Sequence, residues 1–162
     1  MTAGRNDLNR KTRQRMVVLL EERLLDLKDL GHRAEWNQGN VKEPSFIALR
    51  KLFDKVGDDS RTGIQGIVRR IAQLGGSGER SLESSDRREK KGGKTEDPSG
   101  LFSAQEQVAD LSRRLSTFRQ QIRLSIESAD EANDGETADL FRGISRGFDR
   151  YLWLADAARP NR

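Results

Sequence analysis

The stretch FIALRKLFDKVGDDSRTGIQGIVRRIAQL, which runs from Phe46 to Leu74, decides the fold class of this chain. Its apolar residues recur at steps of three and four, the spacing of one face of an α-helix, and Ser60 fills the position that breaks the stripe. Residues 43–45 contain a proline, which a first helical turn tolerates, and Gly75–Gly76 is a typical helix stop. The stretch therefore predicts one long helix.

Apolar stripes of the same period occupy three other parts of the chain: Met16–Leu30, Val108–Ile126 and Phe141–Ala155. The last stripe follows a break at Asn133–Gly135, where Asp134 or Thr137 is suited to cap a helix. We find no β alternation of useful length and no internal repeat. Glycines within the stretch quoted first lower its helix propensity and allow close approach of another helix; they are Gly57, Gly63 and Gly66.

The connections between these helices predict the topology. Residues 38–44 and 131–136 are short joints, which make antiparallel neighbours. Residues 77–100 are charged and rich in glycine and serine, so we expect a mobile crossover. The predicted fold is all-α: a ferritin-like antiparallel four-helix bundle over residues 16–158, with a long crossover between helices 2 and 3. A basic flexible arm, 1–15, precedes the bundle, and 159–162 form a tail.

The composition excludes several kinds of function. The chain has 162 residues, no cysteine and a single histidine, His32, which excludes disulfides, thiolate chemistry and any site that needs two histidines from one chain. No apolar run approaches the roughly 18 residues of a membrane span, and the start carries no secretory signal pattern. We therefore expect a cytoplasmic protein. The net charge of +4 allows a polyanionic partner.

Short motifs then follow one another in a recognisable order. They are Ala34-Glu35-Trp36-Asn37, Pro44-Ser45-Phe46, Leu49-Arg50, Leu52-Phe53-Asp54, Arg70-Ile71, Leu74-Gly75-Gly76, Asp134-Gly135-Glu136-Thr137-Ala138-Asp139-Leu140 and Leu152-Trp153. Across residues 16–158, and with one short insertion before Pro44, this series resembles the Dps family, the small ferritins that protect DNA in starvation and oxidative stress. The resemblance implies a hollow homo-dodecamer that oxidises iron with peroxide at sites between two-fold related subunits, and that often binds DNA non-specifically through a basic tail.

The positions that hold iron in that family are altered here. The pattern has two histidines, and this chain has Glu35 and Arg50 at those positions. The aspartate four residues after the second histidine is kept as Asp54. An aspartate and a glutamate later in the pattern are replaced by Gln65 and Arg69. Arginine has no lone pair to offer and repels a dication. Iron is therefore possible but not expected at the usual site, where Glu35 and Asp54 remain as weak metal ligands.

Helical spacing suggests what replaces the metal. Arg50 and Asp54 share one helix face, and so do Gln65 and Arg69, because each pair is four residues apart. We predict that these side chains and Glu35, from two subunits, form an ion-pair network at the dimer contact. His32, three residues before Glu35, is either a displaced ligand or an exposed side chain. Trp36 is interpreted as a packing residue of the subunit contact, and Trp153 as a packing residue of the core or of an interface.

Two further sets of residues are candidates for binding. The resemblance implies an acidic pore near the fourth helix, where Asp139 matches a pore position and Asp130, Asp134 and Glu136 are candidate companions. The alternative is that these residues cap and solvate a helix start. The N-terminal cations suit non-specific contact with DNA phosphates, or else only solubilise the terminus, and Arg159 and Arg162 would add to them. These cations are Arg5, Arg10, Lys11, Arg13 and Arg15.

Three functions follow from this reading. The first is a Dps-like cage for DNA protection and iron sequestration under stress, in which an ion-pair network replaces the ferroxidase site. The second is a working ferroxidase that uses an unfamiliar or slow interior site. The third is a helical interaction module that forms no cage. Whether the chain is an enzyme is left open by the sequence, because the matching catalytic positions are the altered ones.

Overall fold

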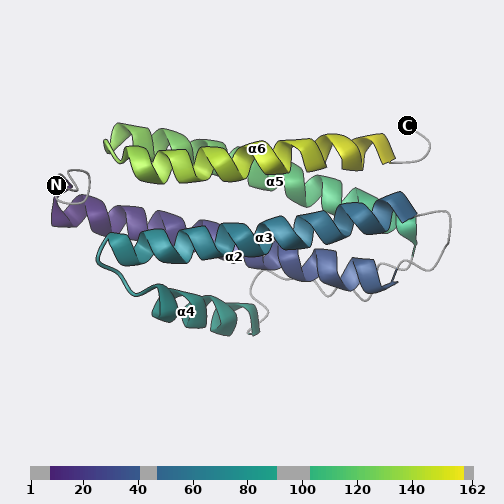
Figure 1. Ribbon diagram of the computed structural model, residues 1–162, viewed down its shortest axis with the longest axis horizontal. Coiled ribbons are helices and arrows are strands. Elements are labelled where there is room, and N and C mark those ends of the chain that lie inside the picture. Colours follow the sequence, from purple (N-terminus) through teal and green to yellow (C-terminus); the bar gives the residue numbers. More distant parts are fainter. Residues whose placement is uncertain (1–7, 41–46, 91–102, 159–162) are drawn as a thin grey trace.

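The computed structural model describes residues 8–40, 47–90 and 103–158, and these residues form helices and turns without a β-strand. The helices are α2 (Arg10–Asn40), α3 (Ile47–Gln73), α4 (Gly78–Lys90), α5 (Ala104–Glu131) and α6 (Gly135–Ala158). In Figure 1, α2 and α3 form one long hairpin, α5 and α6 form a second, and the two hairpins lie against each other. The predicted all-α four-helix bundle is confirmed. None of the described helices is long and apolar enough to span a membrane.

The predicted apolar stripes form the core between the two hairpins. Each of the four long helices contributes fully buried side chains, among them Leu24, Phe53, Leu115 and Phe141. Ser60, which interrupts the stripe of α3, is also completely buried and stands against Gly31 of α2, where an added Cβ would lie 3.3 Å from Ser60 Cβ. Helical periodicity therefore predicted the buried face of α3, including its polar exception.

Two glycines of α3 give neighbouring helices the space to approach. A Cβ on Gly63 would lie 2.8 Å from Leu27 Cδ1 of α2, and one on Gly66 would lie 3.0 Å from Leu140 Cδ1 of α6. At such distances the leucine methyl group would have to move to admit a Cβ, so the absent side chains permit the observed spacing. The prediction that these glycines allow close helix packing is confirmed for both.

The predicted helix ends are set by local hydrogen bonds. Gly75 has a φ of +92°, and the amide of Gly76 donates to the carbonyl of Ile71, which is the Schellman ending of α3. Asn133 plays the same part after α5, with a φ of 59°, while the amide of Asp134 donates to the carbonyl of Ala129. These two reversals direct the chain into α4 and α6.

The structure differs from the sequence prediction in two segments. Residues 78–90 of the crossover form α4, a regular helix, where we expected a mobile segment. Polar contacts hold it to α2: Lys28 Nζ donates to Ser85 Oγ at 3.1 Å, and Ser81 Oγ donates to Glu21 at 2.6 Å. Leu82 of α4 also packs against the core. Residues 91–100 of the crossover lie outside the described part.

The second difference concerns the N-terminal arm. Residues 10–15, predicted as part of a flexible segment, form the first turns of α2. Asn9 caps this helix, because its side-chain oxygen accepts from the amide of Thr12 at 2.8 Å. Leu8 is buried in the core, which anchors the start of the helix. The end of α2 at Asn40 and the start of α3 at Ile47 flank residues 41–46, which lie outside the described part, as does Phe46 of the predicted stripe.

Buried ion pairs join the two hairpins across the core. Arg33 of α2 and Asp110 of α5 are each 2% exposed, and Arg33 Nη1 lies 3.6 Å from Asp110 Oδ2. Arg114 Nη1 of α5 reaches Asp29 Oδ2 of α2 at 2.9 Å. Arg23 donates to Ser125 Oγ at 2.9 Å. These contacts fix how far α2 and α5 slide along each other, because a buried charge without its partner is costly.

Candidate functional site

Three of the predicted site residues stand on the α2–α3 hairpin near its closed end. Glu35 lies at the end of α2, and Arg50 and Asp54 lie in the first turns of α3; all three are exposed in the single chain. The side chain of Gln38 donates to Asp54 Oδ1 at 3.3 Å, and Glu35 lies over Gly57, where an added Cβ would be 3.9 Å from Glu35 Cγ. One half of the predicted site is thus assembled by this hairpin.

A guanidinium group does stand against Glu35, but it belongs to Arg61. Arg61 Nη1 donates to Glu35 Oε1 at 2.6 Å, and its Nη2 donates to Asp58. Sequence reasoning missed both Arg61 and Asp58. Their spacing of three residues signals an ion pair on one helix face, but the antiparallel register of α2 and α3 was needed to bring Glu35 to them.

The other two predicted residues, Gln65 and Arg69, lie further along α3. Eleven residues separate Asp54 from Gln65, which is about 16 Å along a helix axis, so the two halves do not meet within one chain. Gln65 and Arg69 line a groove between α3 and α6, of about 460 Å³, together with Thr62 and Asp139. A complete five-residue site would need a second subunit, and the predicted network across that contact remains a prediction.

The donor set fits iron poorly. Iron(II) sites in proteins use imidazole and carboxylate ligands, and here the half-site on α2 and α3 offers two carboxylates with Arg50 and Arg61 beside them. Among the described residues, no group of three or more histidine, cysteine, aspartate or glutamate side chains is placed to hold a metal ion. His32 is exposed on α2 and joins no such group.

A buried tyrosine contacts two residues that line the groove between α3 and α6, Asp59 and Phe148. Tyr151, the single tyrosine of the chain, donates its hydroxyl hydrogen to Asp59, and Phe148 stands at 5.7 Å between ring centroids. Burial, and next the hydrogen bond to the Asp59 carboxylate, raise the pKa of Tyr151 to about 12. The hydroxyl group therefore stays protonated at neutral pH, with its hydrogen held by Asp59.

Two of the pore candidates belong to a cluster around Arg70. Asp134 is 2% exposed and caps α6, where its Oδ1 accepts from the amide of Thr137 at 3.1 Å and from Arg70 Nη2 at 2.8 Å. Arg70 also donates to Thr137 Oγ1 at 3.0 Å and to Glu136. Within the chain, Asp134 therefore acts as a helix cap, which was the alternative to a pore residue. A role of Glu136 at a pore stays a prediction.

The other two pore candidates are bound by one arginine. Arg142 Nη1 donates to Asp139 Oδ1 at 2.9 Å, and its Nη2 pairs with Asp130. Both carboxylates are exposed, so solvent screens the pairs and a further partner can still reach them. Their part in a pore would depend on neighbouring subunits and stays a prediction.

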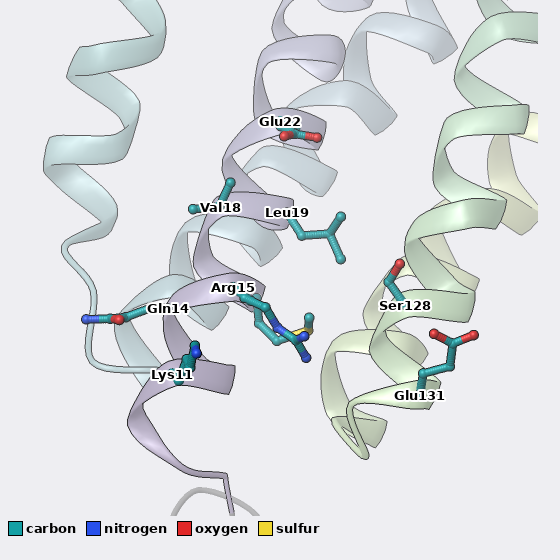
Figure 2. A pocket seen from close by; sticks show the side chains of 9 residues that line it. Lys11, Gln14, Arg15, Val18, Leu19, Glu22, Ser128 and Glu131 are labelled. Carbon is teal, nitrogen blue, oxygen red and sulfur yellow. The ribbon is translucent and has the colours of Figure 1, made fainter.

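The N-terminal cations are presented by a helix. Arg10, Lys11 and Arg15 are exposed on the first turns of α2, while Arg13 is half-buried and donates to the carbonyl of Leu8 at 2.5 Å. Arg5, Arg159 and Arg162 lie outside the described residues. Lys11 and Arg15 line a groove of about 670 Å³ between α2 and α5 (Figure 2). A regular helix thus sets the spacing of these cations.

The two tryptophans differ in their environment. Trp36 is half-buried at the end of α2, whereas Trp153 is 69% exposed on α6. Leu154 beside it is also exposed, so this end of α6 carries apolar surface that the chain itself does not cover. Of the two readings of Trp153, core residue or interface residue, the core reading is wrong and the interface reading stays a prediction.

Comparison with known proteins agrees with this arrangement. The family model of the ferritin-like domain matches residues 20–158. The chain is 29% identical over 153 residues to a DNA protection during starvation protein of Agrobacterium fabrum, with 94% of this chain and 93% of that protein covered.

Two solved structures show the same fold. The first is DpsC from Streptomyces coelicolor, with a TM-score of 0.80, 18% identity, and coverage of 96% of this chain and 89% of that one. The second is a Dps protein from Vibrio cholerae, described as a member of a broad superfamily of ferritin-like diiron-carboxylate proteins. It has a TM-score of 0.77 at 19% identity, with 93% and 92% of the two chains covered.

The chain therefore belongs to the ferritin-like family. Its two antiparallel hairpins, with the short helix α4 in the crossover, are the frame on which the altered residues stand. Within the family it is a Dps-type member, as its motifs and its curated relatives both indicate.

Proposed function

We propose that this protein is a Dps-like stress protein that sequesters iron and protects DNA, and that it lacks rapid ferroxidase chemistry at the contact between subunits. One observation carries the proposal: Arg61 binds Glu35, and Arg50 and Arg69 occupy two further positions that hold metal in the family pattern. Fixed cations at these points oppose the approach of Fe²⁺ by Coulomb repulsion. The relatives named for DNA protection support the wider role.

The altered residues would stabilise the contact between two subunits in place of metal. Glu35 and Asp54 of one chain would face Gln65 and Arg69 of its partner, while Arg61 already neutralises part of the negative charge within the chain. An ion pair that becomes buried at such a contact contributes little net free energy, but it fixes the relative position of the chains. The expected assembly is a homo-dodecamer, and the exposed apolar end of α6 at Trp153 supports self-association.

The solution mass tests this assembly directly. Light scattering should give a particle about twelve times the 18.3 kDa of one chain. A lone protomer at micromolar concentration would contradict the cage and leave only the interaction module. The variant Trp153→Asp should release smaller species if the exposed end of α6 is an interface, with Arg146→Asp on the same helix as the control.

Iron oxidation tests the altered site. Wild-type protein mixed with ferrous iron and peroxide should oxidise iron at the rate of the buffer, with no stoichiometric ferrous binding. A variant that combines Glu35→His, Arg50→His, Gln65→Asp, Arg69→Glu and Arg61→Gln restores the donor types of the family pattern, and it should gain rapid oxidation. Rapid oxidation by the wild type, lost in Glu35→Ala and Asp54→Ala, would overturn the proposal in favour of a working ferroxidase.

DNA retardation tests the basic start of α2. Replacement of Arg10, Lys11 and Arg15 by glutamine should weaken binding to duplex DNA of any sequence and flatten its dependence on salt. Arg13 is left intact because it donates to the carbonyl of Leu8. The triple variant Arg123→Gln, Arg146→Gln, Arg150→Gln removes the same charge elsewhere and serves as the control. Equal retardation by all three proteins would remove the start of α2 from DNA binding.

A further inference from the structure

The contact between Tyr151 of α6 and Asp59 of α3 joins a phenol to a carboxylate within the bundle. The hydroxyl group of Tyr151 donates its hydrogen to Asp59 Oδ2. The same oxygen lies beside the backbone of α6, because a Cβ added at Gly147 would be 3.5 Å from it. Asp59 is only half-buried. The hydrogen of the phenol is therefore held by a base that is itself in contact with solvent.

Few side chains of this protein give up an electron readily. The chain has no cysteine, one tyrosine, two tryptophans and two methionines. A phenol that loses an electron becomes a strong acid, so its oxidation is favoured where a base within hydrogen-bond reach takes the proton in the same step. Tyr151 meets this condition, because Asp59 already accepts its hydrogen bond.

Aromatic rings surround the phenol. Tyr151 is 6% exposed, the ring of Phe148 stands edge-on to it at 5.7 Å between centroids, and the ring of Phe118 stands 5.2 Å from that of Phe148. A phenyl ring is harder to oxidise than a phenol, so an electron deficit on Tyr151 does not pass on to its neighbours. A tyrosyl radical here is also kept away from other phenols, since the ring is buried and the chain has no second tyrosine.

The groove between α3 and α6 connects this pair with solvent. Asp59 and Phe148, the two residues that contact Tyr151, both line the groove, whose volume is about 460 Å³. A small oxidant in the groove comes close to the phenol without the opening of a helix. A proton accepted by Asp59 can leave through water in the same groove.

We propose that Tyr151 and Asp59 form a redox site that consumes radical oxidants derived from peroxide, such as the hydroxyl or carbonate radical. The oxidant takes one electron and becomes hydroxide or carbonate, Tyr151 becomes a neutral tyrosyl radical, and the phenolic proton moves to Asp59. Asp59 then releases that proton to water. A ferrous ion in solution returns the electron and becomes ferric, while one proton from water restores the phenol. The step needs no bound metal and no DNA, so it goes beyond the proposed function.

Pulse radiolysis tests the site without iron. Azide radicals, which take one electron from aromatic side chains, are generated in a solution of the full chain. The wild type should develop the absorbance and the electron paramagnetic resonance signal of a tyrosyl radical, and more slowly in D₂O, because the proton and the electron move together. Asp59→Asn keeps the phenol and an acceptor oxygen but no base, so the radical should form at least about tenfold more slowly.

Two further variants complete the experiment. Asp149→Asn removes a carboxylate two residues from Tyr151 and should form the radical at the wild-type rate. Tyr151→Phe lacks the electron donor, so radicals on the tryptophans should last longer than in the wild type. After exposure to peroxide and ferrous iron, mass spectrometry should find more oxidised tryptophan in Tyr151→Phe and Asp59→Asn than in the wild type. Helix content and melting temperature show that each variant folds.

Three results would overturn the proposal. A wild type that keeps tryptophan radicals and forms no tyrosyl signal would mean that Tyr151 donates no electron. Equal rates for the wild type and Asp59→Asn would mean that Asp59 does not take the proton. Equal tryptophan oxidation in the wild type and Tyr151→Phe would mean that the site consumes no oxidant. The radiolysis contains no iron, so rapid ferroxidase activity, which would contradict the proposed function, leaves its outcome unchanged.

Discussion

Two clusters of arginine and carboxylate in this molecule have similar chemistry but different environments. Arg70 binds Asp134, Glu136 and Thr137 at the start of α6, where Arg70 and Asp134 are 5% and 2% exposed. Arg61 binds Glu35 and Asp58 on the surface of the α2–α3 hairpin, where all three side chains are more than half exposed. Because it is buried, the first cluster holds neighbouring helices together, whereas the second cluster is accessible to a partner.

The difference in burial means that the two clusters contribute differently to the stability of the fold. A buried charge must keep its partner, because the medium cannot replace it, so the Arg70 cluster fixes the turn between α5 and α6. Water can solvate each member of the Arg61 cluster, so those contacts contribute little to the fold. The residues altered relative to the Dps pattern lie on the exposed surface of the single chain, where substitutions cost little stability.

Removal of Arg70 should break the buried cluster and give the largest effect. Arg70→Met leaves Asp134 charged and buried, so the free energy of unfolding should fall by about 3–5 kcal/mol. Urea denaturation followed by circular dichroism measures the change. Arg70→Lys keeps the charge but not the forked geometry, and it should give an intermediate loss. A loss below about 1 kcal/mol for Arg70→Met would place this cluster in the same class as the exposed one.

The hydroxyl of Tyr151 gives the next largest effect and a pH signature. Tyr151→Phe removes a buried hydrogen bond to the Asp59 carboxylate and should cost about 1.5–3 kcal/mol. In the wild type the pKa of Tyr151 is raised to about 12, above that of an unfolded tyrosine, so folding favours the protonated form. Stability should therefore be complete below about pH 10 and decline as the pH rises toward 12.

Ultraviolet titration checks this directly, since the chain contains a single tyrosine. Tyrosinate absorbance should appear near pH 12 in the folded protein and near pH 10 in urea. Asp59→Asn should lower the folded midpoint. A folded midpoint near 10 would show that solvent reaches this hydroxyl group.

Alanine substitutions at two glycines compare a position at a buried helix contact with an open position on the surface. Gly63→Ala places a Cβ 2.8 Å from Leu27 Cδ1, and this crowding should lower the free energy of unfolding by about 1–3 kcal/mol. The higher helix propensity of alanine should offset up to about 1 kcal/mol of that loss. Gly143→Ala on α6 meets no atom within 4 Å and should gain that propensity without a clash. Thermal denaturation of the two variants measures these effects. Equal changes in melting temperature would mean that α2 and α3 can move apart at no cost in free energy.

The exposed cluster should give the smallest effect on stability. Arg61→Met and Glu35→Gln should each change the free energy of unfolding of the isolated chain by less than about 1 kcal/mol. A double-mutant cycle in low and high salt isolates the pair, and the coupling should fall as salt rises. A coupling that exceeds this range or resists salt would indicate that Glu35 and Arg61 become buried between subunits.

Much of the fold could be predicted from the sequence, and less of the site. The stripe containing Phe53 predicted the buried face of α3, and of the two caps expected for α6, Asp134 and Thr137, Asp134 is the one observed. Both predictions succeed because periodicity and capping depend on near neighbours. The same local reasoning missed α4, since its attachment depends on Lys28 and Glu21 of a distant helix. It also treated Arg10–Arg15 as an arm, although Asn9 begins a helix there.

The sequence by itself determined the helices of the bundle, their buried stripes and their ends at Gly75 and Asn133, because each depends on residues within a few positions. Only the tertiary structure decided which charges meet. Arg61 reaches Glu35 across 26 residues and Arg70 reaches Asp134 across 64. The register of the two hairpins sets these pairs, and that register results from packing the whole core, including the missing side chains of Gly63 and Gly66.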